Sequence, residues 1–389
     1  MGKSAGRNLD RLTHLKKVKQ QLFNNAAISR AEIARNTGLH KSTVTSLFNE
    51  LDQQGLVQHL GRGDSTESGG RKPELYTFNT QYGYVACFNI TYDHLYAMFL
   101  YVDGQEISFN RFTVEKREAN VLIKIINREL RKQEKNDNTE NGLLGISISI
   151  HAVVDQNKII HSPYYDFGQL DLCDYFAEHY QVPVLLGNEA NLAAIYERDY
   201  ARAKSPANFI VLSIHRGPGI GVIANSKLFS GFHGMVGELG SVQTRNGKGS
   251  FEEVGDYLSA DFLLDNICQA IAIDSNVDYG TLDKLVSKNE DRLTGLIDEF
   301  VVNAAKVIFN LKMLYGPEEI FINAPLIEQV ELLKAKLKKQ CIENHVDIPV
   351  TIIKGSQYVS LLGAGAAIIR KVVDLKDVNL VFQWSRGIG

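Results

Sequence analysis

The segment ISRAEIARNTGLHKSTVTSLFNELDQQGLV, residues 28–57, constrains the fold of this chain more than any other stretch. Ser29 followed by Glu32 predicts a capping box that opens a short helix. Small or apolar residues supply the packing positions of that helix: Ala31, Ile33 and Ala34. Gly38 then stands where a tight turn between two helices needs a positive φ, and Leu39 can fill the core beside it. The segment therefore predicts two helices joined by a tight turn.

The second predicted helix has two different faces. Apolar residues recur at helical spacing and would face inward: Val44, Leu47, Phe48 and Leu51. The opposite face is short and polar, and its candidate contact residues are His40, Lys41, Ser42, Thr43, Thr45 and Ser46. Small hydroxyl side chains of this kind can approach base edges and phosphates in a DNA major groove. An ordinary helical hairpin that binds no DNA is the alternative that this segment alone leaves open.

The flanking sequence favours DNA binding. Residues 9–23 predict a preceding amphipathic helix, and GLVQHLGRG and RKPELYTFN predict two strands around the polar loop DSTESGG. Three helices and a β-hairpin describe a winged helix-turn-helix, which we assign to residues 1–80. The wing carries three basic residues that can reach DNA: Arg62, Arg71 and Lys72. Because Gly69 and Gly70 precede Arg71, the backbone there can come close to a narrow minor groove. We therefore expect this head to bind double-stranded DNA.

The charge of the chain divides between head and body. Residues 1–72 contain 12 Lys/Arg and 6 Asp/Glu, whereas the remainder contains 30 Lys/Arg and 39 Asp/Glu. A basic head on an acidic body suggests a polyanionic partner for the head alone. No apolar run approaches the roughly 20 residues that span a bilayer, and the start of the chain lacks the apolar core of a secretory signal. We expect a cytoplasmic protein without a membrane partner, whose four cysteines are buried free thiols.

The body from residue 82 onward predicts an α/β fold. Strand-like runs rich in Val, Ile, Phe and Tyr alternate with helical candidates. The strand-like runs are residues 82–91, 94–114, 143–150, 182–188 and 207–215, and the helical candidates are 121–135, 170–180 and 189–200.

Two places in the body can hold a small polar ligand. Asn188 and Glu189 follow an apolar strand and open a helix, where backbone N–H groups and polar side chains converge. Glu238 lies in the Gly-rich segment GFHGMVGELGS. Asn188 as a plain helix cap and Glu238 as a solvated loop residue are the structural alternatives. RGPGIG, residues 216–221, is a weak candidate for a phosphate-binding loop.

Several of these segments together resemble the ROK family (repressors, open reading frames and kinases), in particular its xylose-repressor branch. The shared segments run in order through nearly the whole chain: SRAEIARNTGLHKSTVTSLFNEL, SGGRKPELYTFN, GNEANLAA, GIGVIANSKLFSG, GMVGELGS and LLGAGAAI. The resemblance implies a two-lobed, actin-like (ribonuclease-H-like) sugar-kinase fold behind the head. Its first lobe would span residues 81–187 and its second 188–389, with the C-terminal helix returning to the first lobe. It also implies a homodimeric repressor that binds operator DNA and responds to a small sugar.

Departures from the family pattern predict that the body is not an enzyme. The kinases carry Asp-Ile-Gly-Gly-Thr on their first strand, where this chain has Asn89-Ile90-Thr91-Tyr92-Asp93, so two glycines and the carboxylate are lost. The kinases also have Asn-Asp, whose Asp is the catalytic base, where this chain has Asn188-Glu189. His215 and Arg216 intrude into the second phosphate loop. Ser241 replaces a zinc-binding His, and residues 242–267 contain no cysteine, so we expect neither zinc nor another cofactor.

The resemblance also implies a set of effector-binding residues: His151, Asp155, Tyr164, Asn188, Glu189 and Glu238. His151-Ala152 replaces Pro-Gly of the relatives, and Tyr164 replaces an Asn. Each lost hydrogen-bond partner weakens or redirects recognition by about 1–3 kcal/mol. D-xylose is the first expected effector. An active sugar kinase with a regulatory head, and a DNA-binding regulator that responds to a non-sugar ligand or a partner protein, are the competing interpretations.

Overall fold

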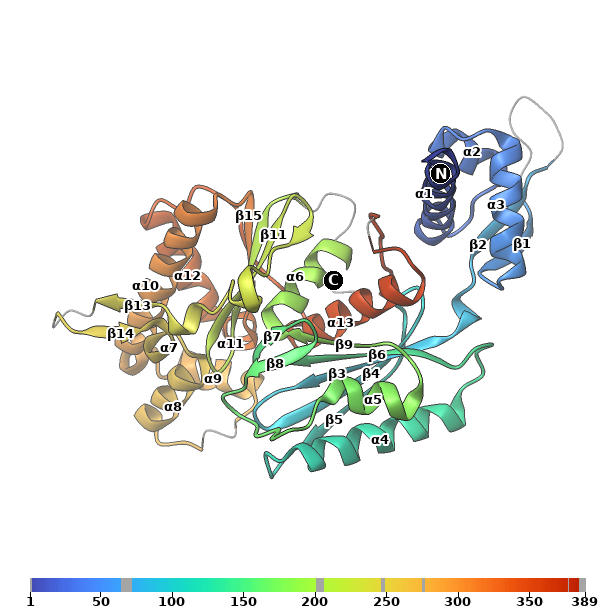
Figure 1. Cartoon of the computed structure of the whole chain (residues 1–389). Helices are drawn as coiled ribbons and strands as arrows, with labels where there is room; N and C mark the ends of the chain where they lie inside the picture. Colours follow the sequence, from blue (N-terminus) through green and yellow to red (C-terminus); the bar gives the residue numbers. More distant parts are fainter. Residues whose placement is uncertain are drawn as a thin grey trace.

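The computed structural model describes residues 2–63, 72–200, 206–245, 249–274, 277–376 and 378–384, with the backbone alone for residues 2–7. It has a small N-terminal head and a body with two sheets (Figure 1). No helix in these ranges is long and apolar enough to cross a membrane.

The head contains the predicted three helices and two strands. They are α1 (Gly2–Asn24), α2 (Arg30–Thr37), α3 (Lys41–Gln53), β1 (Val57–Arg62) and β2 (Glu74–Phe78), and β1 and β2 pair antiparallel. The capping box is confirmed, because Ser29 Oγ accepts from the backbone N–H of Glu32 and the Glu32 carboxylate accepts from that of Ser29. The turn residue Gly38 has a φ of 70°, as the tight turn requires.

The predicted inner face of α3 lies in the core of the head. Its four apolar residues are buried beside side chains of α1, α2 and the wing: Val44, Leu47, Phe48, Leu51, Val18, Leu22, Ile33 and Phe78. Leu39 packs against this core from the turn. Ala31 is exposed, so the prediction that it packs inside α2 is wrong.

The first lobe is built on a five-stranded sheet in the order β5-β4-β3-β6-β9. The strands are β3 (Tyr84–Ile90), β4 (His94–Tyr101), β5 (Glu106–Thr113), β6 (Leu143–Ile150) and β9 (Val184–Asn188). Strands β3, β6 and β9 run parallel, whereas β3, β4 and β5 are antiparallel neighbours. Two helices, α4 (Ala119–Asn136) and α5 (Leu172–Tyr180), share one apolar core with this sheet, and β7 (Val153–Asp155) pairs with β8 (Lys158–His161) at its margin.

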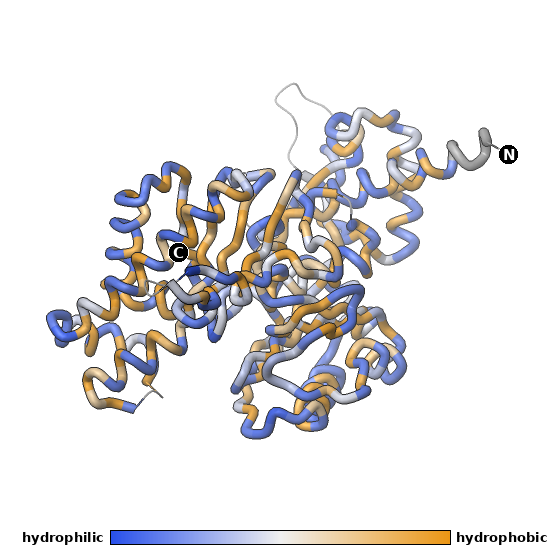
Figure 2. Tube along the Cα trace, turned by 60° about the vertical axis from the view of Figure 1, so that its left-hand side comes forward, coloured by the Kyte–Doolittle hydropathy of each residue, from blue (hydrophilic) through white to orange (hydrophobic). Residues whose placement is uncertain are grey.

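The second lobe is built on the sheet β12-β11-β10-β15-β16. The strands are β10 (Phe209–Ile214), β11 (Pro218–Ala224), β12 (Lys227–Leu228), β15 (Glu319–Asn323) and β16 (Val350–Ile352). Its outer helices are α7 (Val254–Tyr257), α8 (Ala260–Ile271), α9 (Tyr279–Lys288), α10 (Glu290–Tyr315), α11 (Pro325–Gln329) and α12 (Glu331–Glu343). A short hairpin of β13 (Gln243–Arg245) and β14 (Phe251–Glu253) projects from this lobe (Figure 1). In Figure 2 the strands of the sheets carry much of the apolar sequence.

Two helices, α6 (Glu189–Tyr200) and α13 (Ser356–Val372), lie between the sheets. Helix α13 packs against β3 and β6 of the first sheet, whereas α6 packs against β10 and β11 of the second. Both helices contribute to an apolar core that includes Val85 and Cys87 on one side and Phe209 and Val211 on the other. The two lobes therefore meet across one pair of helices.

Two predicted segments differ from the structure. Residues 94–114 form two strands, because a turn at residues 102–105 reverses the chain between β4 and β5. Residues 218–221 of the predicted phosphate loop lie in strand β11. A Cβ at Gly221 would lie 2.2 Å from the carbonyl oxygen of Ala190 in α6, so this glycine serves helix–strand packing. All four cysteines are buried free thiols, as predicted.

Candidate functional site

The polar face of α3 is on the surface of the head. His40, Lys41, Ser42, Thr45 and Ser46 are exposed, and Thr43 is half-buried. A hollow between α2 and α3 begins at this face and is lined by Ala31, Ala34, Arg35, Leu39, His40, Lys41 and Ser42. The apolar face of α3 holds the helix on the head, which leaves its polar face available to a partner.

The wing adds two basic side chains. Arg62 at the end of β1 and Lys72 before β2 are exposed. Arg71, the third predicted contact, lies outside the described residues. The head thus presents basic groups on both α3 and the wing, as the placement of a helix in one groove and a wing beside it requires.

In the body, Glu189 is the centre of a buried polar cluster at the start of α6. The residue as a whole is 3% exposed, and Oε1 of its carboxylate accepts hydrogen bonds from Ser360 Oγ at 2.7 Å, Asn323 Nδ2 at 2.8 Å and Ser213 Oγ at 3.3 Å. His215 Nε2 lies 3.3 Å from the same oxygen. A buried carboxylate is stable only when such donors and a positive charge replace water.

The pKa values of the two histidines near Glu189 shift in opposite directions. Burial would lower the pKa of His215, but the charge and hydrogen bond of Glu189 outweigh it and raise the pKa. Burial would likewise raise the pKa of Glu189, but His215, His151 and Ser360 bring it down to about 2. Burial lowers the pKa of His151 to about 4, and its ring stands edge-on to His215 at 5.3 Å between centroids. The cluster therefore favours the protonated form of His215 beside ionised Glu189 and the neutral form of His151.

Asn188 caps helix α6. Its Oδ1 accepts from the backbone N–H groups of Ala190 at 2.9 Å and Asn191 at 3.2 Å, and its Nδ2 donates to the carbonyl oxygen of Ala152 at 3.0 Å. The cap fixes where α6 begins, and the third bond ties that point to the residue after His151. Asn188 thus has the structural role that the sequence left as the alternative to ligand binding.

The other three predicted effector residues contact different neighbours, away from the Glu189 cluster. Asp155 Oδ2 is 3.1 Å from His233 Nδ1 across the lobes. Burial raises the pKa of Glu238, which His161 partly opposes. Tyr164 packs edge-on against Tyr92 with ring centroids 5.5 Å apart. The structure therefore brings His151, Asn188 and Glu189 together and leaves the other three in different surroundings.

The loop that carries Glu238 packs against both lobes, against Val154 of the first and Ile220 of the second. A Cβ at Gly234 would lie 2.2 Å from the carbonyl oxygen of Val154, and one at Gly237 would lie 2.1 Å from that of Ile220. Both glycines have positive φ, so a side chain at either position would be strained as well as crowded. A separate cavity of about 400 Å³ contains none of the predicted effector residues, and it is lined by residues 157–162, 165–172 and Leu186.

Tyr92 lies at the boundary between the two lobes, at the sequence position where the kinase pattern has a glycine of the phosphate loop. The guanidinium carbons of Arg117 and Arg216 lie 3.9 Å and 3.5 Å from the centre of its ring. Arg216 also pairs with Asp261 in α8 at 3.1 Å. Asn89, in place of the kinase carboxylate, is buried in β3, and no described residue is a hydrogen-bond partner of its Oδ1.

Metal ligands do not gather anywhere in the described ranges: no group of three or more His, Cys, Asp or Glu side chains there has the spacing of a metal site. Sequence reasoning missed Ser213, Asn323 and Ser360 as partners of Glu189. Ser213 and Asn323 stand in register near the carboxyl ends of the parallel strands β10 and β15. A polar residue near the carboxyl end of an otherwise apolar strand was the sequence signal that could have identified these two residues.

The chain matches two known domain families. Residues 92–371 match the ROK family, and residues 24–61 match the IclR helix-turn-helix domain. The chain is 32% identical over 386 residues to the xylose repressor of Lactiplantibacillus pentosus, covering 98% of each chain. It is also 32% identical to the xylose repressor of Staphylococcus xylosus, covering 94% of this chain and 96% of that one.

Solved structures share the fold. A ROK family transcriptional regulator, a homologue of the E. coli MLC protein, superposes with a TM-score of 0.68 at 18% identity, covering 93% of this chain and all of the other. A ROK family glucokinase from Streptomyces griseus, in complex with glucose and AMPPNP, gives a TM-score of 0.62 at 17% identity, covering 73% of this chain and 99% of that one.

Proposed function

This chain belongs to the ROK family, and on that basis we propose that it is a sugar-responsive, DNA-binding transcriptional repressor of carbohydrate catabolic genes. One observation carries the proposal. A winged head with an exposed polar helix face and a ROK body stand on one chain, which is similar to a xylose repressor over 98% of both lengths. We take D-xylose as the first effector to test and a homodimer as the form that binds a palindromic operator.

Helix α3 and the wing make the proposed contact with DNA. Lys41, Arg62 and Lys72 neutralise phosphates, and the hydroxyl groups of Ser42, Thr45 and Ser46 reach base edges or phosphates in the major groove. His40 begins the helix without a side-chain capping bond, so its ring is available to the DNA backbone.

The start of α6 makes the proposed contact with the effector. Sugar hydroxyls both donate and accept hydrogen bonds, so they suit a site with a carboxylate, amides and imidazoles. Glu189, His151 and Asn188 form its centre, with Asp155, Tyr164 and Glu238 around the boundary of the lobes. Because Glu189 Oε1 already accepts several bonds, a sugar hydroxyl that binds this oxygen has to replace one of its present donors.

We further propose that the body transfers no phosphoryl group. Tyr92 and Arg216 pack together at the place of the two kinase phosphate loops, and Asn89 offers no carboxylate there. Without the phosphate-loop glycines and the aspartate of the kinases, the body lacks the backbone cradle and the negative charge that phosphoryl transfer uses.

The test begins with selection of a duplex by the full chain from a random DNA library. A gel-shift titration at physiological salt then compares that duplex with a scrambled one, with and without a panel of aldoses led by D-xylose. We expect specific retardation that D-xylose changes. No specific retardation would refute the DNA-binding role, and a response only to a non-sugar ligand would refute the effector class.

A further inference from the structure

The parallel helices α6 and α13 connect the Glu189 cluster with the head. We infer, on the basis of the proposed function, that this pair and the C-terminal strap, residues 378–384, convey effector binding to α1 of the head. Asp199 and Arg370 are the positioning residues of this connection. Five sets of contacts support it, from the cluster outward.

The two helices are joined at both ends. At the cluster, Ser360 Oγ of α13 donates to Glu189 Oε1 of α6 at 2.7 Å. At the opposite end, Arg370 of α13 donates to both carboxylate oxygens of Asp199 of α6, at 2.7 and 2.8 Å. Each pair is 171 residues apart in sequence, so the helices run in the same direction and in register. The distance between the two junctions along α6 is about 15 Å, at about 1.5 Å per residue.

The middle of the pair has almost no free space. A Cβ at Gly363 would lie 1.8 Å from the carbonyl oxygen of Leu192 and 3.2 Å from the backbone nitrogen of Tyr196. The backbones of the two helices are therefore in direct contact. Close-packed elements shift as units rather than deform gradually, so a displacement at Glu189 reaches Asp199.

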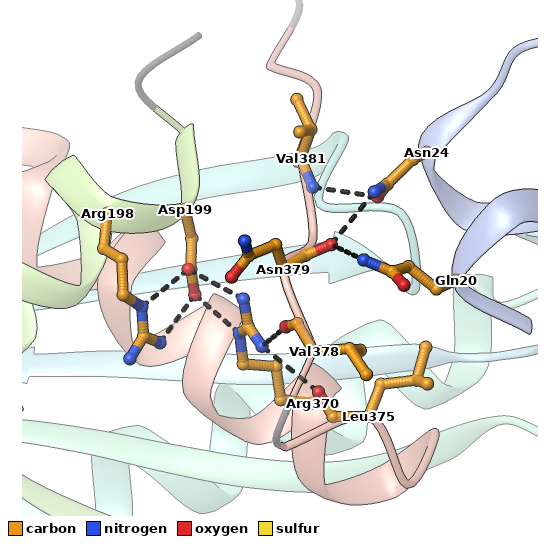
Figure 3. Close-up of polar contacts among 9 residues, drawn as sticks. All are labelled: Gln20, Asn24, Arg198, Asp199, Arg370, Leu375, Val378, Asn379 and Val381. Carbon is orange, nitrogen blue, oxygen red and sulfur yellow. Dashed lines mark hydrogen bonds and ion pairs between the residues drawn. The ribbon is translucent and has the colours of Figure 1, made fainter. Parts of the chain in front are cut away.

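Arg370 links this end of the pair to the strap. In addition to Asp199, its guanidinium donates to the carbonyl oxygens of Leu375 at 3.1 Å and Val378 at 2.6 Å (Figure 3). Arg198 also pairs with Asp199 at 2.8 Å. Asp199 and Arg370 are both buried. One guanidinium therefore fixes both the end of α6 and the path of the chain into the strap.

The strap holds α1 through its backbone. The carbonyl oxygen of Asn379 accepts from Gln20 Nε2 at 2.7 Å and from Asn24 Nδ2 at 2.9 Å, and the N–H of Val381 donates to Asn24 Oδ1 at 3.0 Å (Figure 3). Nearby, the buried Lys19 donates to the carbonyl oxygen of Val373 at 2.9 Å.

An aromatic row continues the same connection. Phe382 of the strap stacks on Tyr200 of α6 with centroids 5.2 Å apart and meets Phe23 of α1 edge-on at 5.1 Å. Its backbone N–H donates to the carbonyl oxygen of Asp199 at 3.1 Å. Phe23 in turn contacts Phe78 of the wing at 5.4 Å. The strap is thus packed between α6 and the core of the head.

The head has a second attachment, so the strap can set its orientation. Asn79, in the segment that leads from β2 into the body, donates to the carbonyl oxygen of Gly55 and to Glu140. A shift of the strap against this fixed point would tilt α1, and α3 with it, because both helices share the head core. An effector that favours one arrangement of the cluster then changes the DNA affinity, and operator DNA changes the cluster by the same coupling free energy.

Hydrogen–deuterium exchange of the full-length protein tests this connection. The probes are D-xylose and the duplex selected by the protein, and the segments followed are residues 16–24 of α1 and 189–200 of α6. In the wild type we expect D-xylose to change exchange in α1 and the duplex to change it in α6. In Asn24→Ala and Arg370→Lys each probe still changes exchange at its own site, but the change at the remote site falls to less than half. Lysine keeps the charge beside Asp199 and loses the fork to Leu375 and Val378, so the core stays paired.

Asn136→Ala is the matched control, because the Asn136 amide is exposed and donates to Lys132 within α4. It should behave as the wild type. If the remote changes persist undiminished in both variants while the wild type responds, the strap is not the connection, although the proposed function stands. If D-xylose changes exchange nowhere in the wild type, D-xylose is not the effector. The connection is then judged by whether the duplex changes exchange in α6 of the wild type and less in the two variants. If neither probe changes the wild type, the proposed function and the coupling both fail.

Discussion

The guanidinium carbon of Arg216, in the second lobe, lies 3.5 Å from the centre of the Tyr92 ring, in the first lobe. The guanidinium carbon of Arg117 lies 3.9 Å from the centre of the same ring, and Asp261 pairs with Arg216 at 3.1 Å. The lobes are therefore joined by a cation–π contact where the sequence pattern of the kinases has its phosphate-binding loops.

Arg216→Ala should lower the free energy of unfolding by about 1 kcal/mol, because it removes one cation–π contact and one partly exposed ion pair. Urea unfolding measures the difference. Arg245→Ala is the control, since Arg245 is exposed and lies over Phe251 within the β13–β14 hairpin. Equal effects of the two variants would mean that Arg216 does not hold the lobes together.

The protein should show no sugar-dependent ADP formation with D-xylose, D-glucose or other aldoses. Tyr92→Gly, which would open the place of the phosphate loop, should not create activity, because Asn89 still lacks a carboxylate. A coupled assay of ATP consumption checks both proteins, with a ROK glucokinase as positive control. Turnover that Glu189→Ala abolishes would contradict the loss of catalysis.

The contribution of His215 to stability should decline as the pH rises. Glu189 raises the pKa of His215 above its ordinary 6.5, so protonated His215 stabilises the folded state fully below pH 6.5, and this contribution is lost as the pH rises through the raised pKa. Glu189 stays ionised here, because its pKa is about 2. Relative to wild type, His215→Gln should cost about 2 kcal/mol at pH 6 and progressively less at higher pH.

Urea unfolding from pH 6 to pH 9 measures this difference, and His179→Gln, at an exposed position of α5, is the control. His151 is present in both proteins, so the cost of keeping it neutral in the folded state below pH 6.5 largely cancels. A cost of His215→Gln that does not vary with pH would refute the ion pair.

The head could be predicted closely from sequence because its signals are local. The capping box of Ser29 and Glu32, the φ of Gly38 and the inner face of α3 each depend on residues within one turn or one helix. The antiparallel turn at residues 102–105 escaped prediction, since apolar residues continue on both of its sides.

The proposed effector site could be predicted only in part because its contacts are distant in sequence. Glu189 was identified from its place after an apolar strand, but its partner Ser360 is 171 residues away and Asn323 is 134 residues away. A polar residue near the end of an apolar strand marks Asn323 as a candidate, but no local pattern shows that either residue is paired with Glu189. The prediction of a phosphate loop around Gly221 failed for a related reason. A glycine required for close contact with α6 cannot be told apart in the sequence from a glycine required for phosphate binding.

Asn188→Ala should impair both the stability and the effector response, because Asn188 caps α6 as well as standing beside Glu189. Loss of the cap costs about 1 kcal/mol. Asn188→Ser keeps a capping oxygen and loses the bond to Ala152, so it should recover most of the stability without the response. Urea unfolding and titration calorimetry with D-xylose separate the two effects. Full effector binding by the serine variant would limit Asn188 to the role of a cap.

Lys41→Ala should weaken binding to all DNA sequences to a similar extent and flatten its salt dependence. Lys41 is exposed at the start of α3, where a lysine neutralises one phosphate. Each neutralised phosphate contributes about 0.9 to the slope of log affinity against log salt, so that slope should become shallower by about this amount. Fluorescence anisotropy between 50 and 300 mM salt, roughly the range in which such slopes are resolved, measures it. Lys124→Ala, at an exposed position of α4 in the first lobe, should leave the slope unchanged. An unchanged slope in Lys41→Ala as well would mean that the start of α3 does not contact the DNA backbone.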